Sequence, residues 1–256
     1  MSILDKFKLD GKAALVTGAS GGLGQAMAIA LAEAGADVAV HSHFDGEADE
    51  TCNAISGFGQ KTVSVSGDMA EREVPRKLVE KIVAEFGKID ILVNNAGMIR
   101  RTPAVDFSEE DWSTVLEVNL SSVFRLSQAA ARKMIEQGAG GKIVNIASLL
   151  SFQGGINVPA YTASKSGVAG LTKAFANEWA RSHINVNAIA PGYMATNNTA
   201  PLRADETRKR QILERIPAGR WGEPEDLAGA VVFLSSPASD YLQGHVLVVD
   251  GGWMAR

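Results

Sequence analysis

The chain has 256 residues, is 46% hydrophobic and carries a net charge of −4. These values predict a single domain over residues 1–256, and they give no electrostatic reason to expect a nucleic acid or an anionic membrane as a partner. Cys52 is the only cysteine, which excludes an intrachain disulfide. With no apolar run of membrane-spanning length, we expect a cytoplasmic protein without a membrane partner.

The first predicted unit is a strand over residues 12–17, a glycine-rich turn and a helix. The turn contains Gly18, Gly22 and Gly24. This order of elements brings main-chain N–H groups and a helix N-terminus to a pyrophosphate. We therefore predict dinucleotide binding at this turn; the alternative is a purely structural tight turn.

A second strand is predicted over residues 37–42. At its end, Ser42 and His43 stand where an acid would hold the ribose 2′-hydroxyl of NAD. They include neither an acid to repel the 2′-phosphate of NADP nor an Arg or Lys to attract it, so the choice of cofactor stays open. His41 and His43 have the spacing of a metal pair, but no third ligand is near in sequence, and we predict no metal.

Two more strands are predicted, over residues 62–66 and 89–93. Asp68 follows the first of them and could either accept a hydrogen bond from adenine or cap a helix that begins near Ala70. The second leads into the small and polar residues 94–97. Such residues let the main chain pass close to a ligand at the carboxyl ends of parallel strands.

The next helix begins at the cap residue Ser108, and its pattern is long enough to contain a bend. Asn119 lies among its apolar positions. A buried amide must be hydrogen-bonded. Asn119 is therefore either a satisfied structural amide or part of a polar relay.

Three side chains follow that suit proton transfer. Ser148 ends a buried strand over residues 142–147, and Tyr161 and Lys165 are one turn apart on the next helix. A lysine cation beside a phenol favours the phenolate, whose pKa is otherwise near 10. The serine could hold a carbonyl oxygen while the tyrosine gives or takes its proton. The alternative is an ordinary surface Tyr–Lys pair.

The last third of the chain completes the sheet. A strand over residues 184–190 leads into a polar segment, and we predict a mobile substrate lid over residues 193–220. A helix over residues 223–235 and a strand over residues 246–250 follow. The alternation predicts an α/β fold of the Rossmann type, a doubly wound parallel sheet of about seven strands with helices on both faces.

In their order and spacing, these motifs resemble the short-chain dehydrogenase/reductase family over essentially the whole chain. The resemblance implies an NAD(P)-dependent oxidoreductase acting on CH–OH groups, with Tyr161 as the acid/base and Ser148 orienting the reacting oxygen. It implies that Lys165 binds the nicotinamide ribose and lowers the pKa of the phenol. Asn119 would support a water that links Lys165 to solvent. Because the family is commonly tetrameric, a homotetramer is implied as well.

The resemblance also implies a cofactor-binding set, with NAD slightly favoured over NADP. This set consists of Gly18, Ser20, Gly22, Leu23, Gly24, Ser42, His43, Asp68, Met69, Asn95, Ala96, Gly97, Tyr161, Lys165, Pro191, Gly192, Met194 and Thr196.

Residues 99–101, 151–155, 192–199 and 216–221 are more closely similar to family members that act on deoxy-keto-sugar acids in uronate breakdown. Such a substrate brings a carboxylate and several hydroxyls, for which guanidinium and amide groups are suitable partners. The predicted substrate set is Arg100, Arg101, Ser148, Gln153, Tyr193 and Asn197. For each of these residues, the alternative is a side chain that is merely solvated or that braces a loop. Competing functions are a 3-oxoacyl-carrier-protein or other small-carbonyl reductase and a nucleotide-sensing module.

Overall fold

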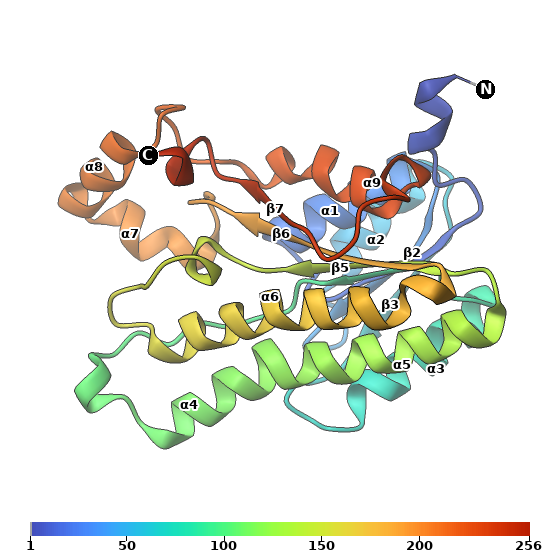
Figure 1. Ribbon diagram of the computed structural model, residues 1–256, viewed down its shortest axis with the longest axis horizontal. Helices are drawn as coiled ribbons and strands as arrows, with labels where there is room; N and C mark the ends of the chain where they lie inside the picture. Colours follow the sequence, from blue (N-terminus) through green and yellow to red (C-terminus); the bar gives the residue numbers. More distant parts are fainter. Residues whose placement is uncertain (1) are drawn as a thin grey trace.

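A computed structural model describes residues 2–256. Within them, seven parallel strands form one sheet in the order β3-β2-β1-β4-β5-β6-β7 (Figure 1). This confirms the predicted doubly wound fold. The strands are β1 (Ala13–Val16), β2 (Asp37–Ser42), β3 (Thr62–Ser66), β4 (Ile91–Asn94), β5 (Gly141–Ile146), β6 (Ile184–Pro191) and β7 (Val246–Val249).

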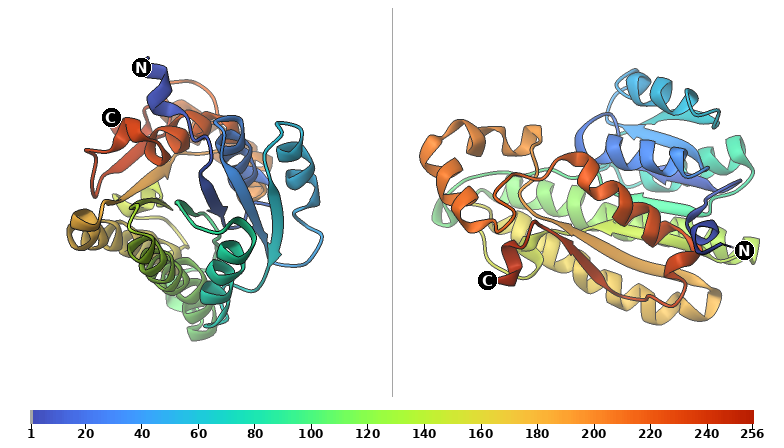
Figure 2. Two further views of the ribbon diagram at one scale, coloured as in Figure 1. Left: turned by 90° about the vertical axis from the view of Figure 1, so that its right-hand side faces the viewer. Right: turned by 90° about the horizontal axis from the view of Figure 1, so that it is seen from above.

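Helices cover both faces of the sheet, as the two views of Figure 2 show. One face carries α1 (Gly22–Glu33), α2 (Asp49–Ser56) and α9 (Ala228–Ser235). The other carries α3 (Val74–Phe86), α4 (Glu109–Leu116), α5 (Ser122–Gln137) and α6 (Pro159–Trp179). No helix within residues 2–256 is both long and apolar enough to cross a membrane.

The central strands are apolar because both of their faces are buried, as is usual in parallel sheets. Successive residues of β1 point to opposite faces: Leu15 packs in the core under α3 and α5, and Val16 in the core under α1 and α9. Val16 pairs with both Val40 of β2 and Val93 of β4. The carboxyl ends of these strands are therefore level, and the strand order reverses there, which is where ligands bind in such sheets.

The structure corrects the predicted start of the third helix. Helix α3 begins at Val74, four residues after the expected Ala70. The carboxylate of Asp68 does accept a hydrogen bond from the Ala70 N–H at 2.8 Å. This bond closes a local turn of the kind that aspartate forms with its own main chain. The chain then runs through further turns before the helix begins at Val74, with Pro75 in its first turn.

The long helical segment expected after Ser108 is interrupted by a π-helical turn. Helices α4 and α5 are joined by one wide π-helical turn, Glu117–Ser121. Such a turn carries an extra residue and is frequent at functional sites. Here it places Asn119 toward the ends of the strands.

The segment after β6 folds over the carboxyl ends of the strands at the left of Figure 1. It contains two short helices, α7 (Ala200–Ala204) and α8 (Glu206–Arg215). It also has an apolar cluster of its own, separate from the two cores beside the sheet. The buried members of this cluster are Leu149, Ile212, Ile216, Trp221 and Trp253.

Candidate active site

The glycine-rich turn lies between β1 and α1 and is fixed by the segment after β4. The hydroxyl oxygen of Thr17 accepts hydrogen bonds from the N–H groups of Asn95 and Ala96, each at 3.0 Å. The Asn95 amide in turn donates to the carbonyls of Thr17 and Gly18, both at 2.9 Å. Asn95, a member of the predicted cofactor-binding set, therefore has a bracing role in the turn.

At two positions in this turn, neighbouring main-chain atoms come too close for any residue other than glycine. Gly18 has φ +60°, and a Cβ there would lie 2.9 Å from the Cα of Ala96. A Cβ on Gly24 would clash with the carbonyl of Gly18. A Cβ on Gly22, which has φ +56°, would lie 3.8 Å from the methyl group of Thr196, so the turn lies opposite the segment that follows β6.

The residues at this turn fit a dinucleotide. Gly21 provides no side-chain cap for α1, so the first N–H groups of that helix have no side-chain partner. Unsatisfied N–H groups at a helix N-terminus attract a phosphate. A Cβ on Gly21 would meet no atom within 4 Å, which leaves room beside these groups.

Three predicted cofactor residues meet at the end of β2. Ser42 is buried, and its hydroxyl donates to the Phe44 carbonyl at 2.8 Å. The ring of His43 packs edge-on against Phe44, and its Nδ1 lies 4.0 Å from the Asp68 carboxylate. Met69, also predicted here, has its side chain in the core beneath them.

The three predicted catalytic side chains meet at the carboxyl end of β5. Ser148 caps the turn after the strand, with its hydroxyl oxygen 3.2 Å from the nitrogen of the Leu150 N–H, and its side chain neighbours that of Tyr161. Tyr161 and Lys165 lie in the first two turns of α6. The Lys165 Nζ is 5.6 Å from the centre of the Tyr161 ring and donates to the Ile146 carbonyl at 2.6 Å.

Burial dominates the electrostatics of this group. It raises the pKa of Tyr161, and the neighbouring Ser148 hydroxyl and the charge of Arg101 oppose that rise. Lys165 is not among the groups that lower it. Lys165 is itself desolvated: burial lowers its pKa to about 8. That Lys165 lowers the pKa of the phenol stays a prediction.

Asn119 is fully buried, and both the oxygen and the nitrogen of its side-chain amide are hydrogen-bonded. Its Oδ1 accepts from the Met98 N–H at 2.8 Å, and its Nδ2 donates to the Met98 carbonyl at 2.9 Å and to the Ser164 hydroxyl at 3.2 Å. The Ser164 hydroxyl donates to the Tyr161 carbonyl at 2.8 Å. Asn119 is thus a satisfied amide that joins the segment after β4 to α6. Its part in a water relay stays a prediction.

The last predicted cofactor-binding residues lie at the end of β6 and just after it. At Gly192, a Cβ would lie 2.6 Å from the Cα of Asp250, so the segments after β6 and β7 touch. The Met194 carbonyl accepts from the Thr199 hydroxyl at 2.6 Å, and the Thr196 carbonyl accepts from the same hydroxyl at 3.0 Å. Thr199, which was not predicted, therefore fixes both predicted residues.

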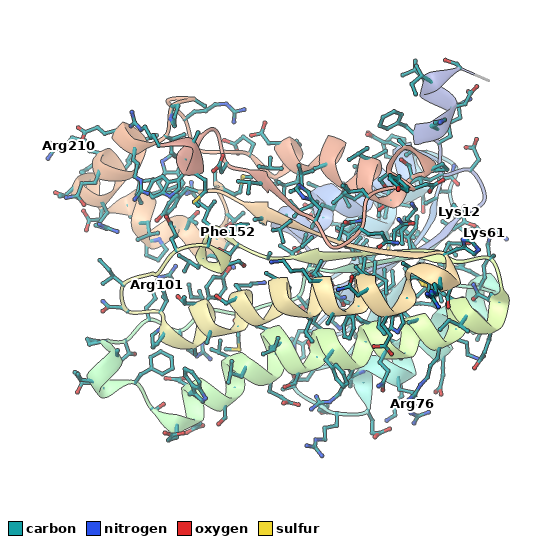
Figure 3. The ribbon with its side chains drawn as sticks, in the orientation of Figure 1. Lys12, Lys61, Arg76, Arg101, Phe152 and Arg210 are labelled. Atoms are coloured by element: carbon teal, nitrogen blue, oxygen red, sulfur yellow. The ribbon has the colours of Figure 1, made fainter. Side chains whose placement is uncertain are left out.

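The two candidate arginines after β4 behave differently. Arg100 forms an ion pair with Asp111 at 3.3 Å, whereas Arg101 donates to the Asn198 carbonyl at 3.0 Å. Figure 3 places Arg101 at the end of the molecule that carries α7 and α8. Arg203 of α7, which the sequence analysis missed, donates to the Thr196 carbonyl at 3.1 Å, and its Nε has no hydrogen-bond partner within residues 2–256. No motif marks Arg203, because only the folded segment brings it to the site.

Two other predicted substrate residues brace the segment over the site. The Gln153 carbonyl oxygen accepts from Trp253 Nε1 at 3.3 Å and from Arg215 at 3.4 Å. The Tyr193 ring packs against Trp253 and Trp221, with ring centres 4.6 and 5.6 Å apart. Burial raises the pKa of Tyr193. Asn197, the last of the predicted set, begins the short turn that accepts from Arg101.

Comparisons with known proteins agree with this geometry. A family model described as enoyl-(acyl carrier protein) reductase matches residues 18–254. The 2-dehydro-3-deoxy-D-gluconate 5-dehydrogenase of Dickeya dadantii is 59% identical over 254 residues, covering 99% of this chain and 100% of that protein.

Solved structures give the same result. A 2-deoxy-D-gluconate 3-dehydrogenase candidate from Agrobacterium tumefaciens with bound NADP has a TM-score of 0.92 and 55% identity, over 98% of this chain and 99% of that chain. A gluconate 5-dehydrogenase from Burkholderia cenocepacia in complex with NADP and tartrate has a TM-score of 0.95 and 40% identity, over 100% of both chains.

Proposed function

Because the chain belongs to the short-chain dehydrogenase/reductase family, we propose that it acts as a 2-dehydro-3-deoxy-D-gluconate 5-dehydrogenase. It is an oxidoreductase that transfers a hydride between NAD(P) and a sugar acid. In the degradative direction it reduces the 5-keto group of 3-deoxy-D-glycero-2,5-hexodiulosonate. The observation that carries the proposal is the meeting of Ser148, Tyr161 and Lys165 beside a dinucleotide turn in a chain 59% identical to such an enzyme.

The bound dinucleotide supplies or accepts the hydride. Tyr161 gives its proton to the carbonyl oxygen during reduction, and Ser148 holds that oxygen through its hydroxyl. Because burial raises the pKa of Tyr161, the phenol is fully protonated at neutral pH and is ready to act as an acid. Oxidation needs the phenolate, so we expect the oxidative rate to rise with pH through the alkaline range.

We propose that Arg101 and Arg203 receive the carboxylate of the sugar acid. Both donate to main-chain carbonyls of the turn around Asn197, Arg101 from the segment after β4 and Arg203 from α7. Each uses one terminal nitrogen on a main-chain carbonyl, which leaves other guanidinium N–H groups for a carboxylate. Arg100 is the weaker candidate, because Asp111 already neutralises it.

For the cofactor, we propose that the end of β2 admits NADP as well as NAD. Ser42 and His43 place no carboxylate against a 2′-phosphate, and two of the related structures contain NADP. The slight preference for NAD predicted from the sequence can be tested at this position. His43→Asp should favour NAD and His43→Arg should favour NADP in the ratio of kcat/KM values; an unchanged ratio in both would remove His43 from cofactor selection.

We propose that residues 193–220 close over the substrate. The Arg215 guanidinium lies 4.0 Å from the centre of the Trp253 ring, and Gln153 bonds to both residues. These contacts hold the segment in a defined position against the rest of the domain. Hydrogen exchange of residues 193–220 should slow when the sugar acid and dinucleotide are added; unchanged exchange would contradict a lid.

We also propose a cytoplasmic homotetramer. Trp112 and Phe124 are large aromatic side chains exposed on α4 and α5, and the Phe124 ring is 6.1 Å from that of Phe175. Exposed apolar groups of this kind mark protein interfaces. Cys52 is a free thiol, in keeping with a reducing compartment. Sedimentation should give the mass of four chains, and Phe124→Glu should lower it.

One kinetic comparison tests the substrate. Initial rates with NADH and NADPH are measured for the diketo sugar acid and for an acetoacetyl thioester, because the matching family model carries the name of an acyl-carrier-protein reductase. We expect a much higher kcat/KM for the sugar acid. A clear preference for the thioester would replace this proposal with the acyl-carrier reductase.

A further inference from the structure

We infer that His41, the next-to-last residue of β2, is a positioning residue for dinucleotide binding that acts through the N–H group of Gly18. The inference rests on the proposed function, because it concerns the same dinucleotide site. His41 is 2% exposed. Its Nδ1 lies 3.1 Å from the Gly18 nitrogen, and its Nε2 lies 3.0 Å from the Gly67 carbonyl oxygen.

These two partners define the state of the ring. The Gly18 N–H can only donate, and the Gly67 carbonyl can only accept. The ring is therefore neutral, with its proton on Nε2. Burial lowers the pKa of His41 to about 4, which keeps the ring in this neutral form throughout the neutral pH range.

The main chain of His41 holds the next residue of the turn. Its carbonyl accepts from the Ala19 N–H at 2.8 Å. On the other side, the fully buried Thr51 hydroxyl donates to the Ala19 carbonyl at 2.9 Å and accepts from Gln25 of α1 at 3.0 Å. The turn is thus connected to β2 and α2 by a set of contacts distinct from those made by the segment after β4.

The Gly18 contact affects binding because a glycine in a turn has many accessible conformations. Gly18 sits at φ +60°, and the bond to His41 favours that conformation over the others. If the turn is in its binding conformation for only a fraction of the time, the apparent affinity falls by that fraction. We expect loss of the acceptor to weaken dinucleotide binding about tenfold, with kcat at saturating dinucleotide little changed.

Two substitutions of similar size separate the two contacts of the ring. His41→Asn can place a carbonyl oxygen near the position of Nδ1 and so keep an acceptor for Gly18. His41→Gln can place its amide near the position of Nε2 and keeps only the contact to Gly67. His245→Gln is the control, since His245 is exposed and precedes β7 at the opposite edge of the sheet.

The measurement is the dissociation constant of NADPH and of NADH by fluorescence titration. We expect the Asn variant and the control to bind within about threefold of the parent, and the Gln variant to bind about tenfold more weakly. Equal affinities of the Asn and Gln variants would overturn the inference. If the parent bound neither dinucleotide, the proposed function would fail instead.

A spectroscopic measurement on the parent does not depend on the folding of a variant. Long-range ¹H–¹⁵N spectra identify which ring nitrogen of His41 carries the proton. We expect the Nε2–H tautomer, with the Gly18 amide proton protected from exchange. A proton on Nδ1 would overturn the inference, because the ring could then accept nothing from Gly18.

Discussion

The dinucleotide side and the substrate side of this site are built in different ways. The dinucleotide side uses glycines, main-chain N–H groups and short connections after β1, β2 and β4, which lie level in the sheet. The substrate side uses long side chains that reach across the site from the segment after β4, from α7 and α8, and from the C-terminal turn. The glycine motif of the first side lies in one short stretch of sequence, although Asn95 braces it from far along the chain, whereas every contact named for the second side joins residues that the sequence does not group.

The largest effect on activity is expected from removing the Tyr161 hydroxyl, the proton donor on the substrate side. Tyr161→Phe should lower kcat about a thousandfold, as expected for the loss of a positioned proton donor. The dissociation constant of NADPH should stay close to that of the parent, because the dinucleotide turn lies on the other side of the site. Steady-state rates measure kcat, and fluorescence titration measures the dissociation constant of NADPH. Activity equal to that of the parent would remove Tyr161 from the mechanism.

Lys165 lies at the boundary between the two sides, and its burial makes a prediction about stability. Its pKa is about 8 in the folded protein, against an ordinary value of 10.5. Between these values the unfolded chain binds the proton and the folded chain does not, so the free energy of unfolding rises with pH. We expect a rise of about 2 kcal/mol between pH 8 and pH 10 in the parent.

Lys165→Met should lose that rise and most of kcat. Urea unfolding at several pH values and one protein concentration measures the first effect. The range ends near pH 10 because the tyrosines of the unfolded chain titrate around that pH. The same slope in the parent and the variant would show that the amine of Lys165 is not desolvated as the structure indicates.

On the dinucleotide side, a substitution at Gly24 should disrupt the turn, whereas a substitution at Gly21 should leave it intact. Gly24→Ala should destabilise the protein by about 2 kcal/mol and weaken dinucleotide binding, because its Cβ would clash with the Gly18 carbonyl. Gly21→Ala is the matched control: its φ of −173° is ordinary extended backbone, and its Cβ would meet no atom within 4 Å. Thermal unfolding without ligand compares the two. Equal melting temperatures would show that the turn adapts more readily than the close contact suggests.

The smallest effect distinguishes the two arginines. Arg101→Ala should raise KM for an acidic substrate about tenfold and leave KM for a neutral ketone nearly unchanged, whereas Arg100→Ala should have little effect on either. The ion pair between Arg100 and Asp111 is the reason for the difference. Similar losses for the acidic and the neutral substrate in Arg101→Ala would mean that Arg101 supports the loop instead of binding a carboxylate.

The same contrast explains what the sequence could predict. The parallel sheet, the glycine turn and the grouping of Ser148 with Tyr161 follow from periodicity and short spacings, and the structure has them. Gln153 was predicted to bind substrate hydroxyls, but its carbonyl oxygen accepts from Trp253, a hundred residues away in the chain. No local pattern contains that contact.

Charge and burial also limited what could be predicted from the sequence. The one-turn spacing of Tyr161 and Lys165 suggested a lysine that lowers the pKa of the phenol. The sequence alone does not reveal that Lys165 would be only 4% exposed or that Arg101 would supply the opposing charge. His41 was considered only as half of a metal pair, because its partners Gly18 and Gly67 offer main-chain atoms that no motif records.

Deuteride transfer tests the central claim most directly. NADPH and NADH carrying deuterium on the transferred position are incubated with the diketo sugar acid and the enzyme, with Tyr161→Phe as the control. The account predicts 2-dehydro-3-deoxy-D-gluconate labelled at C5, formed by the parent and almost absent with the variant. A product without deuterium at C5, or labelling of an acetoacetyl thioester in preference to the sugar acid, would contradict it.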